Sequence, residues 1–180
     1  MGTITNLREG EPMPEVRMDI QSIVVGGGPM ASLVVLKPRH EGSAPTSKLP
    51  IRIGRIEAAA ISMGVDSSLA KRPTTHDLLS TAVERLGARI TSVCVVDVRD
   101  TTFYAEVRLS CASGESLTLD ARPSDALALA VRAHAPIFAS LDVLNRAALP
   151  DFGGVEQAER EREEAAFHEF VEGLSPEDFA

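Results

Sequence analysis

The chain has 180 residues, of which 44% are hydrophobic and 24% are charged, a composition typical of one soluble globular domain. A formal net charge of −8 excludes the broad basic surface of a protein that holds nucleic acid through many phosphate contacts. Aromatic residues make up 4% and Trp is absent, so few side chains are available to stack on unpaired bases.

The negative charge is concentrated at the C-terminal end. Residues 155–180 contain nine acidic residues and two arginines, a balance of −7, whereas residues 1–154 have a balance of −1. We therefore predict a flexible arm over 1–13, a near-neutral domain over 14–147 and an acidic helical extension over 148–180. No lysine follows Lys71, so any phosphate contact in the second half uses arginine, which favours bidentate geometry.

The first predicted element is a strand over 16–25, where polar and apolar residues alternate before an apolar end. Gly26, Gly28 and Ala31 then fit the G-x-G-x-x-A pattern of a dinucleotide-binding turn. That motif requires a helix next. The segment 32–38 is instead short, contains β-branched valines and ends in proline. We therefore predict a glycine turn between two strands.

The elements after residue 38 alternate between strands and helices. The chain continues with a loop over 39–47, a strand over 49–53, a helix over 55–63 and a helix from an N-cap at Thr75 to Gly87, which has Leu78, Leu79, Ala82, Val83 and Leu86 on one face. Three strands follow, with turns at 99–102 and 112–115, and then a helix after Pro123 with Leu127, Ala130, Val131 and His134 in one stripe. The last predicted elements are a strand over 135–138, a helix capped by Ser140 and an acidic helix from Val155. This order predicts the α+β class, with short helices packed on a largely antiparallel sheet.

The two cysteines have no metal-binding or redox spacing. If the strands beside the turn at 99–102 pair, Cys94 lies opposite about Val107, which places a disulfide to Cys111 out of register. We expect two reduced cysteines and a cytoplasmic protein. The sequence has no charged-then-apolar leader and no run of 18 apolar residues, so we predict neither a signal peptide nor a membrane partner.

Polar residues gather where the predicted helices begin. In residues 119–138 a strand leads directly into Arg-Pro-Ser-Asp and an alanine-rich helix. Ser and Asp beside Pro are what a helix start needs, but Asp120 and Arg122 are not required for capping. Further polar residues at element ends are Glu57, Arg72, Thr75, His76, Asp77, Asp97, Arg99, Ser124 and Asp125. Two helix starts with nearby arginines can bind a phosphate through backbone N–H groups.

These residue types suggest phosphodiester chemistry. Carboxylates in one cleft bind Mg²⁺ or Mn²⁺ and activate water, and a histidine transfers protons. We predict no organic cofactor, and catalytic roles for His76, Asp120, Asp125 and Glu57. We predict that phosphate is bound by Arg72, Arg122 and Ser124. The predicted metal ligands are Asp120, Asp125, Asp77 and Asp97. Structural roles stay open, because first-turn acids stabilise helices and strand-end charges form ion pairs.

Five ordered segments carry a resemblance to a known family, namely LPIRIGRIEAAAI, RPTTHDLL, VVDVRDTTFYAEV, LDARPSDALALAVRAHAPIF and FHEFVEGLSPEDF. Together they resemble the bifunctional nuclease domain family of bacteria and plants, over roughly residues 14–147 for the domain itself. The last segment lies in the acidic tail, which resembles the extension that many bacterial members carry. The resemblance implies cleavage of both RNA and DNA, a homodimer, and a functional role for Glu57, Arg72, His76, Asp77, Asp97, Asp120, Arg122, Ser124 and Asp125. Thr101 and Thr74 depart from the usual pattern of the family without affecting these residues.

Two functions therefore compete. The first is a low-specificity, metal-dependent nuclease or phosphodiesterase that grips nucleic acid weakly and locally. The second is a non-catalytic regulatory or binding module for an anionic metabolite or a protein partner. The near-neutral domain favours the module, whereas the mixture of carboxylate, histidine and arginine favours the nuclease. Convergence in one open cleft would support catalysis, and the residues concerned are Glu57, His76, Asp97, Asp120 and Arg122.

Overall fold

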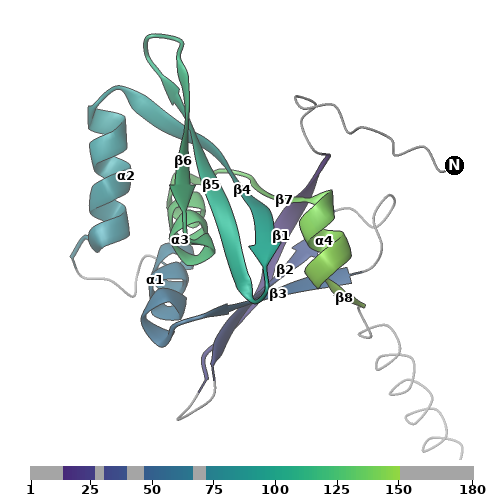
Figure 1. The fold of residues 1–180 in the computed structure, drawn as a ribbon. Helices are drawn as coiled ribbons and strands as arrows, with labels where there is room; N and C mark the ends of the chain where they lie inside the picture. Colours follow the sequence, from purple (N-terminus) through teal and green to yellow (C-terminus); the bar gives the residue numbers. More distant parts are fainter. Residues whose placement is uncertain (1–13, 27–30, 40–46, 67–71, 151–180) are drawn as a thin grey trace, which may run out of the picture. The chain divides into compact units, whose positions relative to one another are not determined.

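The computed structural model describes residues 14–26, 31–39, 47–66 and 72–150, which form an α+β fold as predicted (Figure 1). The elements are β1 (Glu15–Val24), β2 (Ser32–Pro38), β3 (Ser47–Ile53), α1 (Arg55–Val65), α2 (Thr75–Arg85), β4 (Ala88–Arg99), β5 (Thr102–Cys111), β6 (Ser116–Ala121), α3 (Pro123–Ala133), β7 (Ile137–Ser140), α4 (Leu141–Ala147) and β8 (Leu149–Pro150). The predicted arm over 1–13 and the predicted acidic helix from Val155 lie outside the described residues.

The strands form one sheet in the order β6-β5-β4-β7-β1-β2-β3-β8. Two antiparallel meanders, β1-β2-β3 and β4-β5-β6, are joined by β7, which pairs antiparallel with β1 and parallel with β4. Both α1 and α3 therefore follow the third strand of a meander. In Figure 1 the helices α1, α2 and α3 lie on one side of the sheet and α4 lies at the other.

The core forms where α3 packs on the sheet and on α1. Leu127, Ala128 and Ala130 of α3 are at most 1% exposed, and α3 contacts α1, α2, β4 and β5. The small alanine side chains let the helix approach its neighbours closely. Burial of the Leu127 side chain stabilises the fold by about 2 kcal/mol. Ile61 of α1 and Met18 of β1 complete this contact and are fully buried. The start of α3 is thereby held rigidly against the sheet.

The apolar face predicted for α2 is largely uncovered. No residue of α2 is buried, and the exposed fractions are 67% for Leu78, 48% for Leu79 and 86% for Leu86. The predicted N-cap at Thr75 is wrong by one residue, because Thr74 has the extended backbone of the cap and Thr75 is already helical. The helix therefore begins as expected but presents leucines to the surface.

The β4–β5 hairpin has a register that the sequence did not predict. Irregularities lie between Ile90 and Ser92 and between Val95 and Asp97, and each shifts the pairing by one residue. Cys94 therefore lies opposite Glu106 rather than the predicted Val107. Both cysteines are free, as expected.

The ends of α3 and α4 complete the framework. His134, predicted to continue the stripe of α3, instead forms its C-cap in the left-handed conformation with φ of 51° and is exposed. Ser140 caps α4 as predicted, because its hydroxyl accepts a hydrogen bond from the N–H of Val143 at 3.2 Å. Within the described residues, no helix has the length and apolar character needed to cross a bilayer.

Candidate functional site

The junction of β6 and α3 brings two opposite charges together. Pro123 takes the first helical position, which suits its fixed φ, and Arg122 is the extended N-cap. Asp125 follows in the first turn, where the helix dipole favours a negative charge. Arg122 Nε donates to Asp125 Oδ2 at 2.7 Å and Nη2 donates to Oδ1 at 3.1 Å. The predicted helix start is therefore also a bidentate ion pair.

This ion pair extends to the starts of two other helices. Arg122 Nη1 donates to Glu57 Oε1 of α1 at 3.2 Å, and His76 Nε2 of α2 lies 3.2 Å from Asp125 Oδ1. We call Glu57, Arg122, Asp125 and His76 the polar network. It joins residues that are 65 and 49 positions apart in the chain. Because β3 and β6 lie far apart in the strand order, it is the packing of α1 and α2 against α3 that brings these residues together.

The polar network lies at the surface without being fully solvated. The side chain of Arg122 is 66% exposed, whereas those of Glu57, Asp125 and His76 are 26%, 32% and 20% exposed. Burial alone would raise the pKa of Asp125, but hydrogen bonds from Arg122 and His76 outweigh it and lower that pKa. The same contact with Asp125 raises the pKa of Arg122. Asp125 is therefore held as an anion between two donors.

Gly54 gives the carboxylate of Glu57 its place in the network. Gly54 is the N-cap of α1, and a Cβ at this position would lie 2.0 Å from Glu57 Oε2. Any larger residue would therefore push the carboxylate away from Arg122. The glycine is required here by a close approach of a side chain rather than by its backbone angles.

Three hollows meet at the polar network. Glu57 and Arg122 both line a cleft of about 280 Å³ between the start of α1 and the tip of the β4–β5 hairpin. Arg122, Asp125 and His76 lie at a mostly apolar groove of about 500 Å³ between α2 and strands β5 and β6. Glu57 and His76 also line a third hollow of about 960 Å³ along α1. A ligand entering any of the three reaches at least two members of the network.

Asp77 lies next to His76 in the sequence but makes different contacts. Its Oδ2 accepts hydrogen bonds from the N–H and the hydroxyl of Thr74, both at 2.6 Å, and its Oδ1 accepts one from Arg132 Nε at 2.6 Å. These bonds, with those from Thr74 the strongest, lower the pKa of Asp77 to about 2. The bond between Asp77 and Arg132 joins α2 to α3. Because the Arg132 side chain is only 6% exposed, this contact belongs to the packing of the two helices.

Asp97 and Asp120 also lie outside the polar network. Asp97, at the end of β4, accepts hydrogen bonds from Arg99 Nε at 2.8 Å and from Arg146 Nη1 of α4 at 3.2 Å. The bond from Arg99 is the main reason why the pKa of Asp97 is lowered. Asp120 of β6 pairs with Glu106 of β5 and lines the mostly apolar groove. Of the five residues expected in one cleft, Glu57, His76 and Arg122 are connected, whereas Asp97 lies in a separate ion-pair cluster.

The donor set does not fit a divalent-metal centre. Across 14–26, 31–39, 47–66 and 72–150, no three or more His, Cys, Asp or Glu side chains are grouped so as to hold a metal ion. Mg²⁺ and Mn²⁺ need converging carboxylate oxygens, and both oxygens of Asp125 already accept hydrogen bonds from Arg122. Of the predicted ligands, Asp77, Asp97 and Asp125 each pair with a different arginine, while Asp120 lines the same groove as Asp125.

Comparison with known proteins identifies the family. A family profile described as the bifunctional nuclease domain matches residues 34–151, well over half of the chain. The chain belongs to this family. It is also 39% identical over 135 residues to two proteins of Mycobacterium tuberculosis, called uncharacterized protein MT1877 in strain CDC 1551 / Oshkosh and uncharacterized protein Rv1829 in strain ATCC 25618 / H37Rv. Each match covers 73% of this chain and 80% of the relative.

The two remaining phosphate-binding candidates of this bifunctional nuclease domain have contrasting positions. Ser124 is 7% exposed and lines the cleft beside Glu57 and Arg122, directly after the proline that starts α3. Arg72 is exposed before α2 and lines none of the three hollows around the polar network. Ser124 is therefore next to the network, and Arg72 is separate from it.

Sequence reasoning missed residues that the bifunctional nuclease domain brings to the cleft from other elements. Arg52 of β3 and the hairpin residues Thr101 and Thr102 line it opposite Arg122. The outward position of Arg52 follows from strand alternation, so its exposure was predictable. Its place in the same cleft as the hairpin tip was not, because β3 does not pair with β4 or β5 and their approach depends on the tertiary packing.

Proposed function

We propose that this protein hydrolyses phosphodiester bonds of nucleic acid at the polar network. The observation that carries the proposal is the continuous connection of Glu57, Arg122, Asp125 and His76 at a surface where three hollows meet. Membership of the bifunctional nuclease domain family supports the same activity. The network contains an anion-binding group and a proton-transfer group within one chain of contacts.

Arg122 is the group that would bind the phosphate. A guanidinium has five N–H donors, and the described contacts of Arg122 use Nε and one donor each of Nη1 and Nη2. Two N–H donors therefore stay available on a side chain that is 66% exposed. Charge-assisted hydrogen bonds from these donors would hold a phosphate oxygen and stabilise negative charge developing on it.

His76 is the group that would transfer protons. Its Nε2 contacts Asp125 Oδ1, so the carboxylate orients the ring and leaves Nδ1 as the second nitrogen for a water or a leaving oxygen. A carboxylate that orients a histidine is a recurring arrangement of acid–base catalysts. Glu57 has a different role, because it holds Arg122 from the opposite side and fixes the direction of the guanidinium.

The grip on nucleic acid is expected to be local. The network itself contains one exposed guanidinium, that of Arg122, and Arg52 and Arg55 are the exposed arginines that line the adjoining hollows within the described residues. The chain outside residues 155–180 has a net charge of only −1. Each phosphate contact contributes about one unit to the logarithmic salt dependence of binding. We therefore expect weak binding with a shallow salt dependence, and low sequence specificity.

The experiment compares cleavage of labelled single-stranded RNA and DNA by the wild type, His76→Ala and the control Asp100→Asn, each with and without EDTA. Asp100 lies at the hairpin tip with φ of 54°, a conformation that asparagine tolerates. We expect His76→Ala to lose about a hundredfold in rate, as for loss of a general acid or base, and the control to keep its rate.

EDTA separates the proposed chemistry from a metal-dependent one. Because the donor set does not fit a metal centre, we expect the wild-type rate to survive EDTA. A rate that disappears in EDTA would overturn proton transfer by His76 as the main source of catalysis. Equal cleavage by the wild type and His76→Ala would attribute the activity to contamination and leave the second function, a non-catalytic module for an anionic ligand. The satisfied ion pairs of the network are the observation that favours this second function.

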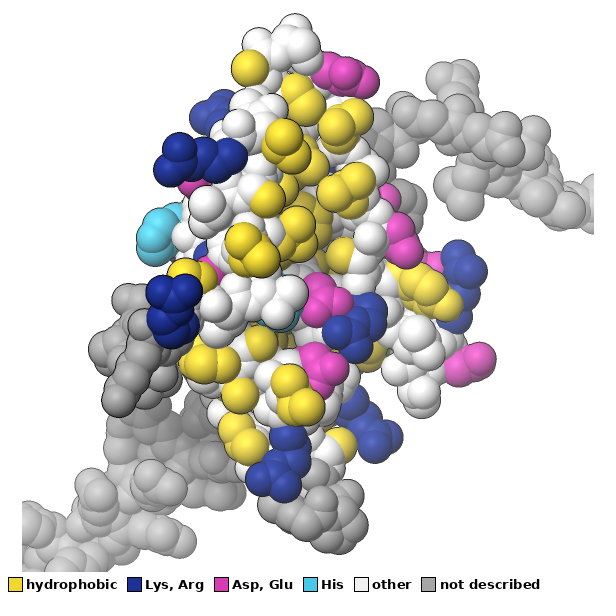
Figure 2. All heavy atoms as spheres, turned by 90° about the vertical axis from the view of Figure 1, so that its left-hand side faces the viewer, with side chains coloured by type: hydrophobic (Ala, Val, Ile, Leu, Met, Phe, Trp, Pro, Cys, Tyr) yellow, Lys and Arg dark blue, Asp and Glu magenta, His cyan; other side chains and the backbone are white. Residues whose placement is uncertain are grey.

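We also propose that two copies associate through the surface formed by α2 and β6. Figure 2 shows hydrophobic side chains gathered into a band on this face. Beyond the leucines of α2, β6 exposes Leu117 at 39% and Leu119 at 49%, and it is an edge strand of the sheet. An exposed apolar edge strand pairs readily with another strand, and a second copy supplies the same strand about a twofold axis. The near-neutral domain opposes this contact little.

Sedimentation velocity tests the homodimer. Leu119→Lys should convert the dimer to a monomer, because it places a charge among the apolar side chains between α2 and β6. Val24→Lys, an equally exposed hydrophobic position on β1, serves as the control and should leave the dimer intact. A wild-type monomer at high concentration would contradict the proposal.

The two free cysteines also support our proposal of a reducing, cytoplasmic location.

A further inference from the structure

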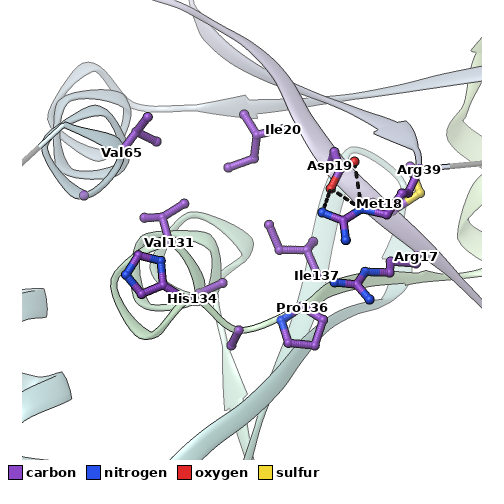
Figure 3. Close-up of a pocket in the computed structure, with 13 residues that line it drawn as sticks. Arg17, Met18, Asp19, Ile20, Arg39, Val65, Val131, His134, Pro136 and Ile137 are labelled. Carbon is purple, nitrogen blue, oxygen red and sulfur yellow. Dashed lines mark hydrogen bonds and ion pairs between the residues drawn. The ribbon is translucent and has the colours of Figure 1, made fainter.

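A separate hollow lies at the opposite ends of α1 and α3. It has a volume of about 530 Å³ and is bordered by β1, by the end of α1 and by the turn after α3 (Figure 3). The polar network lies at the starts of the same two helices, each of which has 11 residues. At 1.5 Å per residue, about 16 Å separates the two ends, so this hollow is a distinct site.

One part of the hollow is apolar. Ile20, Val131 and Ile137 surround it from β1, α3 and β7, and Val65 borders it from the end of α1 (Figure 3). Ile137 is 8% exposed, while Ile20 and Val131 are partly buried against the core. These branched side chains belong to three packed elements, so the hollow is preformed. Its volume falls in the range that holds a small molecule, about 300–1,000 Å³.

The other part of the hollow is positively charged. Arg39 is paired with Asp19, with Nε donating to the carboxylate at 3.0 and 3.1 Å. Arg17, which lies beside this pair in Figure 3, is exposed and its side chain has no hydrogen bond or ion pair with the residues that the structure describes. Two guanidiniums and one carboxylate therefore leave one uncompensated positive charge at this end.

We infer that this hollow binds a small amphipathic carboxylate, with its head group on Arg17 and its apolar body along Ile20, Val131 and Ile137. A single net positive charge matches a monoanionic head better than a polyanion. The branched aliphatic lining matches a hydrocarbon body rather than a polar one. Binding of such a ligand is independent of the proposed nuclease function, because no residue of the polar network lines this hollow.

The experiment titrates the isotope-labelled full-length chain with octanoate, 1-octanol and acetate and follows backbone amide signals. We expect saturable shifts by octanoate at residues 17–20 and 131–137. The neutral 1-octanol should bind about fivefold more weakly, since it lacks the charge-assisted contact, and acetate should not saturate because it lacks the apolar body. Equal affinity for octanoate and 1-octanol would overturn the assignment of the head group to Arg17.

Four variants test the position of the ligand. Arg17→Gln should lower the affinity for octanoate to that for 1-octanol, whereas Arg89→Gln, an exposed arginine of β4 outside the hollow, should not change it. Val65→Glu should weaken octanoate binding by repulsion. Val65→Lys places a long side chain of the opposite charge at the same 64%-exposed position and should preserve binding. Octanoate shifts confined to the α2–β6 surface, or an unchanged affinity in Arg17→Gln, would refute the site.

Discussion

Asp77 and Asp125 hold the same place in two helices, yet their surroundings differ. Each is the third residue of its helix, and each is hydrogen-bonded to an arginine side chain. The helix of Asp77 begins after the N-cap Thr74, and the helix of Asp125 begins with Pro123. Arg132, the partner of Asp77, is 6% exposed, whereas Arg122, the partner of Asp125, is 66% exposed. A first-turn aspartate with an arginine therefore fastens two helices in one case and lines an open groove in the other.

The difference arises from the number of contacts made by each arginine. Arg132 donates to Asp77, to the hydroxyl of Thr74 and to the carbonyl oxygens of Ala60 and Ala128. Its guanidinium is thus enclosed between α1, α2 and α3. Among the residues that the structure describes, Arg122 instead donates only to carboxylates and keeps donors that these contacts do not use. An arginine with spare, accessible donors is suited to an anionic ligand, and one with enclosed donors is suited to stability.

Replacing the two arginines tests this contrast most strongly. Arg132→Met should lower the free energy of unfolding by about 3 kcal/mol, because it leaves Asp77 and two helix carbonyls without their buried partner. Arg122→Met should lower it by less than about 1 kcal/mol, as expected for an exposed ion pair. Urea unfolding of both variants measures the difference, and equal losses would remove the structural distinction.

The two aspartates should differ in activity in the opposite sense. Asp125→Asn should slow cleavage of RNA by about tenfold or more, since His76 loses its orienting carboxylate. Asp77→Asn should keep the rate of the wild type at a temperature where both variants are folded. Initial rates on the same oligonucleotide decide between these outcomes. Greater damage from Asp77→Asn would reverse the assignment of the two sites.

The pH dependence of stability sharpens the comparison. The pKa of Asp77 falls from 3.8 to about 2 on folding, so its contribution is complete above the unfolded value and is lost as the pH falls towards 2. Because its side chain is 34% exposed, we expect a contribution of about 1 kcal/mol after screening by solvent. The stability lost between pH 5 and pH 2 should be smaller by this amount in Asp77→Asn. An unchanged loss would contradict the hydrogen bonding seen at Thr74.

The smallest expected effect comes from Gly54→Ala. The added methyl group lies where the Glu57 carboxylate sits, and a flexible side chain moves aside at little cost to stability. Arg122 then loses one of its two supports, so we expect cleavage to slow by about threefold, the equivalent of one exposed ion pair. Kinetics alongside thermal unfolding would measure both effects. A faster enzyme would show that Glu57 competes with the substrate for Arg122.

The local sequence pattern determined which segments form helices and strands. Pro123 with Asp125 predicts the start of α3, Ser140 predicts the cap of α4, and the β-branched residues after the glycines predict strand β2. The predicted glycine turn itself includes residues 27–30, which lie outside the described residues. These signals depend on backbone hydrogen bonds and side-chain spacing within a few residues, so they are readable without tertiary structure. The one-residue displacement of Cys94 shows the limit, because a bulge leaves no local mark.

The amino-acid sequence alone thus placed polar residues at helix starts and predicted that some of them meet. Only the tertiary structure decided that His76 meets Asp125, while its neighbour Asp77 meets Arg132. Both choices depend on how α2 packs against α3. Such contacts join residues about 50 positions apart, and their geometry is set by the packing of the whole core rather than by any short segment.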